Sequence, residues 1–287
     1  MKTLVFISYH KKAPLLPSNL FQPLHVGRDL KLAATKDQKS ITNSDFSWLL
    51  SETCGDNTGD NISSKNREFC EMTGIYWIWK NLSKFENVSH VGHMQYRRHF
   101  YLNRNNFDEL PENVEKKAYA CVHLNRTIDK NYLNELGWEN ERLYEILNQY
   151  TGVLPLSGNL SCLKMSNLWE DYLERIPGTH VDDLVRLRTL LTQEAPEFSV
   201  LFDDYLENNK KLMYQMFILK KEDFIKYCEF IFPLLFKLEK QLYLDKYSLN
   251  GKRTLGYLAE LIYGCYFYNL KKNGNFFETG VSFVENI

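Results

Sequence analysis

Short apolar runs separated by polar segments dominate the first part of the chain. Four runs have the length and the β-branched or aromatic content of buried strands: residues 4–8, 88–94, 118–124 and 152–156. Residues 29–62, between the first two runs, are polar and rich in turn-forming residues. The pattern therefore predicts an α/β amino-terminal part that extends to about residue 165.

Helical periodicity first appears after this polar segment. A helix is expected to begin at residues 64–66, because Glu68 and Glu71 then lie in its early turns, where the helix dipole favours acids. Phe69 and Tyr76, seven residues apart, fall on one apolar face of that helix. This aromatic stripe is typical of a helix packed on a core, although its ends could also contact a sugar.

The second half of the chain is predicted to be mostly helical. Its helical patterns cover residues 182–193, 199–208 and 222–242. Pro233 should kink or split the last of these, and residues 214–219 form a β-like run. No internal repeat or linker interrupts the chain. We therefore expect one compact unit, in which a mostly helical part, residues 166–287, packs on the α/β part, residues 1–165.

Charge and cysteine spacing argue against several classes of protein. The chain has 35 basic and 36 acidic residues, so it lacks the basic excess of proteins that bind nucleic acid. Its six cysteines are far apart and form no CxxC pair, which argues against a zinc ribbon or a disulfide scaffold. We therefore expect reduced thiols in a cytoplasmic protein.

Hydropathy argues against a membrane-spanning segment. No apolar stretch reaches the length of a spanning helix, and the amino-terminal run lacks the features of a signal peptide, so it is predicted to be a strand. Residues 263–272 combine aromatic residues with lysines, which suits peripheral contact with anionic lipid at the inner face of the cytoplasmic membrane. The alternative is a helix face buried in the fold.

Basic side chains follow two of the predicted strands. His10 and Lys11 come directly after the first strand, and Arg97 and Arg98 follow the second. Ligands of α/β proteins gather beyond the carboxyl ends of strands, and paired arginines can bind a diphosphate through bidentate hydrogen bonds. The alternative is a solvated surface turn whose arginines pair with nearby carboxylates.

No Asp-x-Asp motif is present, although this motif holds the diphosphate-bridging metal ion in ordinary nucleotide-sugar transferases of the GT-A type. Positive charge on the departing phosphate can do the same electrostatic work. The available cations are Arg97, Arg98, His10 and Lys11. Sugar transfer by this chain would therefore be metal-independent. The chain also lacks GxGxxG, P-loop, HExxH and GxSxG motifs.

Two acidic segments are further candidates. The loop at residues 56–63 is rich in Gly, Asp and Asn, so it could hold a metal, a ribose or a sugar, but it lacks the ligand spacing of an EF-hand and is equally typical of a structural turn. Asp183 lies close to His180 and suits a general base that activates an acceptor hydroxyl. The alternative there is that Asp182 simply caps the following helix.

Several of these segments resemble one bacterial family. They are the loop at residues 8–12, the sequence Gly-Asp-Asn-Thr-Gly-Asp-Asn-Ile-Ser at residues 55–63, Tyr76-Trp77, Tyr96-Arg97-Arg98 and His180 with Asp183-Leu184. The family occurs in capsule, O-antigen and lipo-oligosaccharide gene clusters, and its domain was long catalogued as one of unknown function. The resemblance spans residues 4–262.

This resemblance implies a glycosyltransferase, specifically a hexosyltransferase, with a GT-A-like Rossmann-type mixed sheet flanked by helices. The donor would be a nucleotide-diphosphate sugar, UDP-linked, with galactose in pyranose or furanose form as a candidate sugar. The acceptor would be a surface-polysaccharide, lipo-oligosaccharide or other lipid-linked glycan. No further cofactor is implied.

The resemblance also assigns roles to residues. The donor nucleotide is expected to contact His10, Lys11 and Tyr96. Hydroxyl groups of the ribose or sugar are expected to contact Asp60, Asn61, Asn66 and Glu71. The diphosphate is expected to contact Arg97, Arg98 and nearby His93, and the acceptor is expected to contact Asp183 as general base.

This chain departs from the family pattern at several positions, among them Glu260-Leu261, which stands in place of a Glu-Arg pair, and Phe230-Ile231-Phe232, which stands in place of Trp-Leu-Phe. Gln95 replaces a histidine before Tyr-Arg-Arg, His99 replaces an aromatic residue, and Gln215 replaces an asparagine. Both glutamines keep hydrogen-bonding ability, so activity is expected to be retained while donor or acceptor choice differs. Two rival functions stay open: a capsule sugar-phosphate transferase, and a non-catalytic glycan-binding protein.

Overall fold

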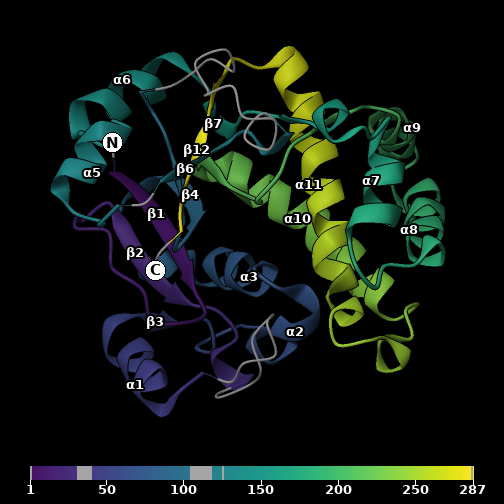
Figure 1. The fold of residues 1–287 in the computed structure, drawn as a ribbon, viewed down its shortest axis with the longest axis horizontal. Helices are drawn as coiled ribbons and strands as arrows, with labels where there is room; N and C mark the ends of the chain where they lie inside the picture. The colour runs from purple at the N-terminus through teal and green to yellow at the C-terminus, as the bar shows by residue number, and fades with distance from the viewer. Residues whose placement is uncertain (1, 31–40, 104–117, 125, 286) are drawn as a thin grey trace.

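The computed structural model describes residues 2–30, 41–103, 118–124, 126–285 and 287 (Figure 1). Within these residues, ten strands form one mixed sheet. Its main path runs in the order β11 (Phe276–Thr279), β7 (Gly152–Pro155), β10 (Phe217–Lys220), β4 (Val88–Gln95), β1 (Lys2–Tyr9), β2 (Phe21–His25) and β3 (Cys54–Gly55). Strands β1 to β4 are mutually parallel, and β10 runs antiparallel between β4 and β7.

A side branch of the sheet leaves the end of β4. It consists of β5 (Arg98–Phe100), β12 (Val281–Val284) and β6 (Cys121–Leu124). Strand β12 lies between the other two, antiparallel to β5 and parallel to β6. The branch therefore brings the carboxy-terminal part of the chain next to the segment that follows β4.

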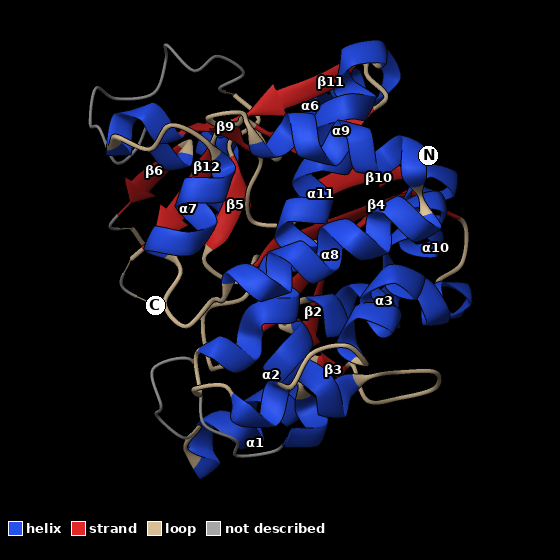
Figure 2. Cartoon of the chain, turned by 90° about the vertical axis from the view of Figure 1, so that its right-hand side faces the viewer, coloured by secondary structure: helices blue, strands red, loops and turns tan. Residues whose placement is uncertain are grey.

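Helices cover both faces of the sheet (Figures 1 and 2). They are α1 (Asn43–Glu52), α2 (Asn66–Phe69), α3 (Met72–Asn81), α5 (Lys130–Leu136), α6 (Asn140–Gln149), α7 (Leu168–Arg175), α8 (Val181–Glu194), α9 (Pro196–Leu206), α10 (Lys221–Glu239) and α11 (Thr254–Asn273). Along β1, Leu4 and Phe6 pack into one apolar cluster with α3, α10 and α11, whereas Val5 and Ile7 pack into another with α5 and α6. This alternation is that of a strand buried on both faces.

The architecture confirms the α/β fold expected from the sequence. The first two predicted strands correspond to β1 and β4, and the run at residues 152–156 corresponds to β7. Strands β10, β11 and β12 come from the part of the chain after residue 165 and complete the sheet. Helices α7, α8 and α9 lie outside α10 and α11, farther from the sheet (Figure 1).

Three local expectations are corrected by the structure. The polar segment 29–62 contains helix α1, whose N-cap Thr42 accepts a hydrogen bond from the Asp45 amide at 3.0 Å. The helix after residue 64 is interrupted at Cys70, where φ is 52°. Pro233 lies inside one continuous helix, α10, so the expected split does not occur.

The candidate membrane-contacting segment lies within α11. Tyr263 and Phe267 are buried against the core, and Lys271 is bound to Glu278 at 2.6 Å. The aromatic side of this segment therefore packs inward. In the described part of the chain, no helix is both long and apolar enough to cross a bilayer.

Candidate functional site

The two basic segments meet at the carboxyl edge of the parallel strands. Ser8 of β1 is in register with Gln95 of β4, and the Tyr96 amide donates to the Ser8 carbonyl at 3.1 Å. The residues that follow each strand, His10 and Lys11 after β1 and Arg97 after β4, therefore emerge side by side. This adjacency is what the strand-end argument predicted.

Tyr96 is the centre of this basic group. Its ring is buried, with the His10 ring 5.1 Å away between centroids. The Lys11 Nζ lies 5.6 Å and the Arg97 Cζ 5.7 Å from the Tyr96 centroid, both within the range of cation–π attraction. Lys11 also donates to the Ile287 carbonyl at 2.9 Å. The Tyr96 ring thus gathers three basic side chains at one place.

Arg97 and Arg98 are supported by aromatic rings. The Cζ atoms of both arginines lie 4.8 Å from the centroid of Phe283, and Arg98 also lies 5.1 Å from the centroid of Tyr214. No carboxylate of the described residues lies within salt-bridge distance of either guanidinium. The ion-paired surface turn, which was the alternative interpretation, is not what this part of the structure shows.

Gln95 connects Arg98 to a carboxylate indirectly. The Arg98 Nη1 donates to Gln95 Oε1 at 2.6 Å, and the Gln95 amide nitrogen donates to Glu71 Oε1 at 3.3 Å and to the Tyr214 carbonyl at 3.2 Å. Arg98 Nε is buried and has no hydrogen-bond partner among the described residues. Glu71, between α2 and α3, is therefore one hydrogen-bonded side chain away from Arg98.

The turn before β10 completes this group. Tyr214 and Gln215 have φ values of 76° and 51°, a left-handed conformation that costs free energy in residues other than glycine. The Tyr214 amide donates to Glu260 Oε1 at 2.8 Å, and the Tyr214 hydroxyl donates to the Tyr119 carbonyl at 2.7 Å. Burial raises the pKa of Glu260, although Lys211 opposes this. The sequence analysis had assigned no role in binding or catalysis to Tyr214, Glu260 or Phe283.

His93 lies in the core rather than with the arginines. Its ring is fully buried, with Nε2 2.8 Å from Ser8 Oγ and Nδ1 2.8 Å from the Gln215 carbonyl. Burial lowers the pKa of His93 to about 4, so the ring is neutral at pH 7. The ring joins β1, β4 and the left-handed turn, and it brings no positive charge to a diphosphate.

The Gly-Asp-Asn loop is tied down by its own side chains. Asp56 is buried and accepts four hydrogen bonds, from the amides of Gly27 (2.8 Å) and Arg28 (3.1 Å) and the hydroxyls of Ser63 (2.5 Å) and Thr73 (2.8 Å). Burial raises the pKa of Asp56, and these donors oppose the rise. Asp56 thus fastens the turn after β2 to the start of α3.

The other polar residues of this region are split between two places. Asn66 lies beside the turn after β2 and donates to the Cys70 carbonyl at 2.7 Å and to Thr73 at 2.9 Å. The Asp60 carboxylate, in contrast, accepts from the Tyr76 hydroxyl at 3.0 Å, and the Asp60 carbonyl accepts from Asn81 at 2.8 Å, at the far end of α3. Asn61 accepts from the Ser63 amide within the same loop. The structure does not bring Asp60 and Asn61 to the arginines.

Asp183 is buried in the helical part. Its carboxylate accepts from the hydroxyls of Tyr247 and Thr254, the latter at 2.9 Å. Asp182 lies in the first turn of α8, whose N-cap is His180. Asp183 thus joins the start of α8 to the start of α11.

A cavity of about 530 Å³ opens next to the basic group. It is lined by Lys12, Ala13, Pro14, Leu15, Asp45, Trp48 and Ile287. The Trp48 ring lies 6.0 Å from Tyr9, which itself lies 5.9 Å from Tyr96. Separately, no group of three or more His, Cys, Asp or Glu side chains among the described residues is arranged to hold a metal ion.

Comparison with known proteins assigns the chain to a family. Residues 4–272 match the family described as "Domain of unknown function (DUF4422)". The chain belongs to this family. No curated protein matches it. Among solved structures, it is similar to the apo form of WbbM, a bifunctional glycosyltransferase, at 26% identity and a TM-score of 0.82.

The extent of that similarity differs between the two proteins. It covers 100% of this chain but only 46% of the WbbM chain, so this member of the family spans less than half the length of the solved protein. At this TM-score the match agrees with the GT-A-like fold, a mixed sheet flanked by helices, that the resemblance implied. It leaves the activity of this chain to be argued from its own residues.

Proposed function

We propose that this chain is a glycosyltransferase that moves a hexose from a nucleotide-diphosphate donor to a glycan acceptor. The observation that carries the proposal is the similarity of the entire chain to a glycosyltransferase structure. The residues at the carboxyl edge of β1 and β4 support it, because they have the charge that such a reaction requires.

The electrostatic argument concerns the leaving group. As the bond between sugar and phosphate breaks, negative charge grows on the diphosphate, and fixed cations nearby stabilise the transition state. Arg97 and Arg98 have no carboxylate partner among the described residues, and Lys11 lies in the same basic group. These cations are our candidates for the role that a metal ion has in other transferases, so we propose a metal-independent reaction.

The cavity beside Lys12 is our candidate site for the nucleoside. Its volume of about 530 Å³ is within the range of small-molecule sites, and Trp48 gives it an aromatic wall. The adjoining Tyr96 group would then receive the diphosphate. UDP as the nucleotide and galactose as the sugar are the family-based parts of this proposal.

The carboxylates divide into two sets for this reaction. Glu71 lies beside the arginines and can bind a hydroxyl of the transferred sugar or of the acceptor. Asp183 is buried and accepts from two hydroxyl groups, which favours a structural role over that of a general base. Measuring kcat for Glu71→Gln and for Asp183→Asn tests which of these carboxylates takes part in the reaction. A variant that loses kcat but remains folded identifies that carboxylate.

The biological setting is part of the same proposal. The acceptor would be a lipid-linked glycan of a surface polysaccharide, and the protein would act in the cytoplasm with peripheral contact at the inner face of the membrane. Flotation of the purified protein with anionic liposomes at low salt tests the contact. Absence of binding would argue against membrane contact and would not affect the proposal that the chain is a glycosyltransferase.

The deciding experiment is product analysis with a panel of UDP-, GDP-, CDP- and dTDP-sugars. We expect one donor to raise the melting temperature and to yield nucleoside diphosphate together with a glycosidic product. A phosphodiester product would indicate a sugar-phosphate transferase, and glycan binding without consumption of any donor would indicate a non-catalytic protein. The double variant Arg97→Ala/Arg98→Ala is the control for contaminating activity.

A further inference from the structure

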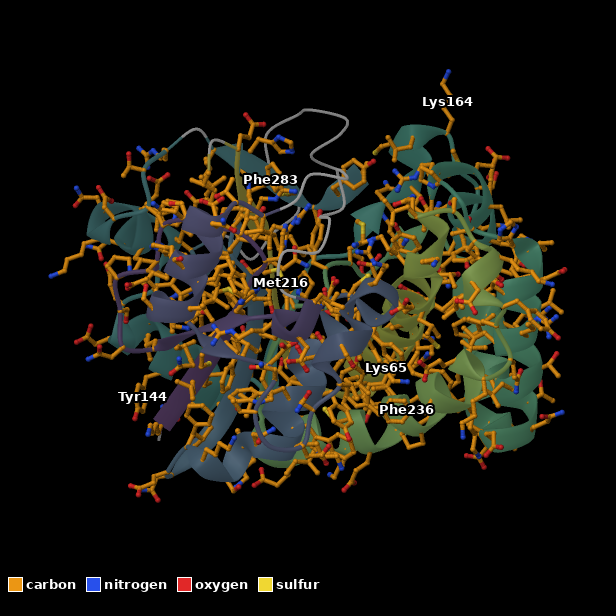
Figure 3. The ribbon with its side chains drawn as sticks, turned by 90° about the horizontal axis from the view of Figure 1, so that it is seen from below. Lys65, Tyr144, Lys164, Met216, Phe236 and Phe283 are labelled. Atoms are coloured by element: carbon orange, nitrogen blue, oxygen red, sulfur yellow. The ribbon has the colours of Figure 1, made fainter. Side chains whose placement is uncertain are left out.

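Phe283 lies at a position that serves both arginines at once. It belongs to β12, where it is paired in register with Arg98 of β5 (Phe283 is labelled in Figure 3). Its ring centroid lies 4.8 Å from the Cζ of Arg97 and 4.8 Å from the Cζ of Arg98. One aromatic ring therefore contacts two neighbouring guanidinium groups.

A second aromatic ring, that of Tyr214, also lies near Arg98. Tyr214 lies 5.1 Å from the Arg98 Cζ, and its backbone is fixed by Glu260 on the amide side and by Gln95 on the carbonyl side. Arg98 thus lies near two rings, with one nitrogen bound to Gln95 at 2.6 Å. These neighbours restrict the guanidinium without neutralising it.

Contact with an aromatic ring affects the charge of the arginines differently from contact with a carboxylate. Two adjacent arginines repel each other, and a carboxylate placed between them would hold them but would also cancel the charge needed for an anion. An aromatic face attracts each cation through its quadrupole and leaves the net charge unchanged. The arrangement is therefore suited to holding two positive charges ready for an anionic ligand.

We propose that Phe283 is a positioning residue that holds Arg97 and Arg98 together on one diphosphate. This inference rests on the proposed function, and it names a residue that acts through the arginines and has no direct part in the reaction. Removing the ring leaves both arginines present but free to separate, so the loss falls on the transition state, where preorganised charge matters most.

The test compares two phenylalanines of the carboxy-terminal strands. Phe283→Leu removes the ring beside Arg97 and Arg98, and Phe283→Tyr keeps a ring there. Phe277→Leu is the matched control, because Phe277 in β11 also lies near an arginine, Arg142, at 5.8 Å. Phe277 is 3% exposed, so its loss reports the cost of removing a buried ring elsewhere.

We expect Phe283→Leu to lower kcat about tenfold with little change in the donor KM, and Phe283→Tyr to keep near-normal kcat. Phe277→Leu should lower the melting temperature without this loss of kcat. In an Arg98→Ala background, which keeps measurable turnover, Phe283→Leu should lower kcat by less than in the wild type. Normal kcat in folded Phe283→Leu, or the same tenfold loss in the Arg98→Ala background, would overturn the proposal.

Failure of the proposed function is detected separately. If the wild-type protein consumes no nucleotide sugar, that function is wrong, and the positioning proposal is then tested by calorimetric titration with inorganic pyrophosphate. Weaker binding by Phe283→Leu than by Phe277→Leu supports it. Equal binding by the two variants, or no binding by the wild type, overturns it.

Discussion

Two groups of basic side chains in this molecule are held in opposite ways. Lys211 and Arg175 both pair with one buried carboxylate, Asp171, at 2.8 Å and 2.5 Å. Arg97 and Arg98 have aromatic rings and an amide as neighbours, and no carboxylate of the described residues pairs with them. Lys211 also lies 3.7 Å from Glu260, so both cations of the first group have carboxylate partners, whereas the second group has none among the described residues.

The difference separates a structural role from a functional one. A buried carboxylate with two cations is stable only as a complete set, because each charge would be costly alone. Arginines next to rings lose little when an anion arrives and gain a partner that they lack. Changes in the first group should therefore act on stability, and changes in the second should act on turnover.

The largest expected effect is on stability, from Asp171→Ala. The change leaves Lys211, which is only 3% exposed, without its close partner, and we expect a loss of about 3–5 kcal/mol in the free energy of unfolding. Chemical denaturation measures it. Asp203→Ala, which breaks the exposed pair with Arg188, is the control and should cost under about 1 kcal/mol. Equal costs would contradict the distinction.

The next effect is on turnover, from Arg98→Ala. Loss of one preorganised donor to the diphosphate should lower kcat about a hundredfold, equivalent to about 3 kcal/mol, with a modest change in donor KM. Arg98→Lys should recover only part of kcat, because lysine cannot make the two-pronged contact. The melting temperature should change little, since no ion pair is lost. Near-normal kcat in the folded alanine variant would move the diphosphate site elsewhere.

A smaller effect is the pH dependence of the first group. Burial alone would raise the pKa of Asp171, but Lys211 and Arg175 hold it below its usual value of 3.8. A depressed folded pKa means that the stabilisation is fully present above pH 3.8 and is lost as pH falls through the lower folded value. The stability difference between wild type and Asp171→Asn should therefore shrink below that pH. A difference that stays constant from pH 6 to pH 3 would refute this.

The smallest expected effect is that of EDTA on the second group. If arginines neutralise the leaving diphosphate, excess EDTA should change the rate of donor consumption by less than about twofold. A transferase with a known metal requirement, assayed in parallel, shows that the chelator is effective. Complete loss of activity that manganese or magnesium restores would mean that a metal ion shares the task.

Local pattern was enough to predict the strands that precede the two basic segments. Strand ends at Tyr9 and Gln95 follow from apolar runs, and parallel neighbours put the residues after them on one edge. Helix α1 was missed because its apolar periodicity is weak, although Thr42 followed by Asp45 resembles a capping signal that could have revealed it.

The partners of the arginines could not be predicted in the same way. Phe283 and Tyr214 reach Arg98 through pairing of β12 with β5 and through a left-handed turn, and neither contact leaves a period in the sequence. For the same reason, the hydrogen bonds from Tyr247 and Thr254 to Asp183 could not be predicted, because they depend on the packing of α8 against the start of α11. Periodicity reports the buried face of an element and leaves its tertiary neighbour unspecified.

The late position of β12 in the chain also has a kinetic consequence. In that pairing, Ser282 donates to the His99 carbonyl across a sequence separation of 183 residues. Contacts between such distant segments require closure of a long loop and tend to form late in folding. A ribosome-bound chain that has already folded β1 to β4 would thus carry both arginines before it has their aromatic support. Competence to bind a diphosphate tightly should accordingly appear only after β12 has paired with β5.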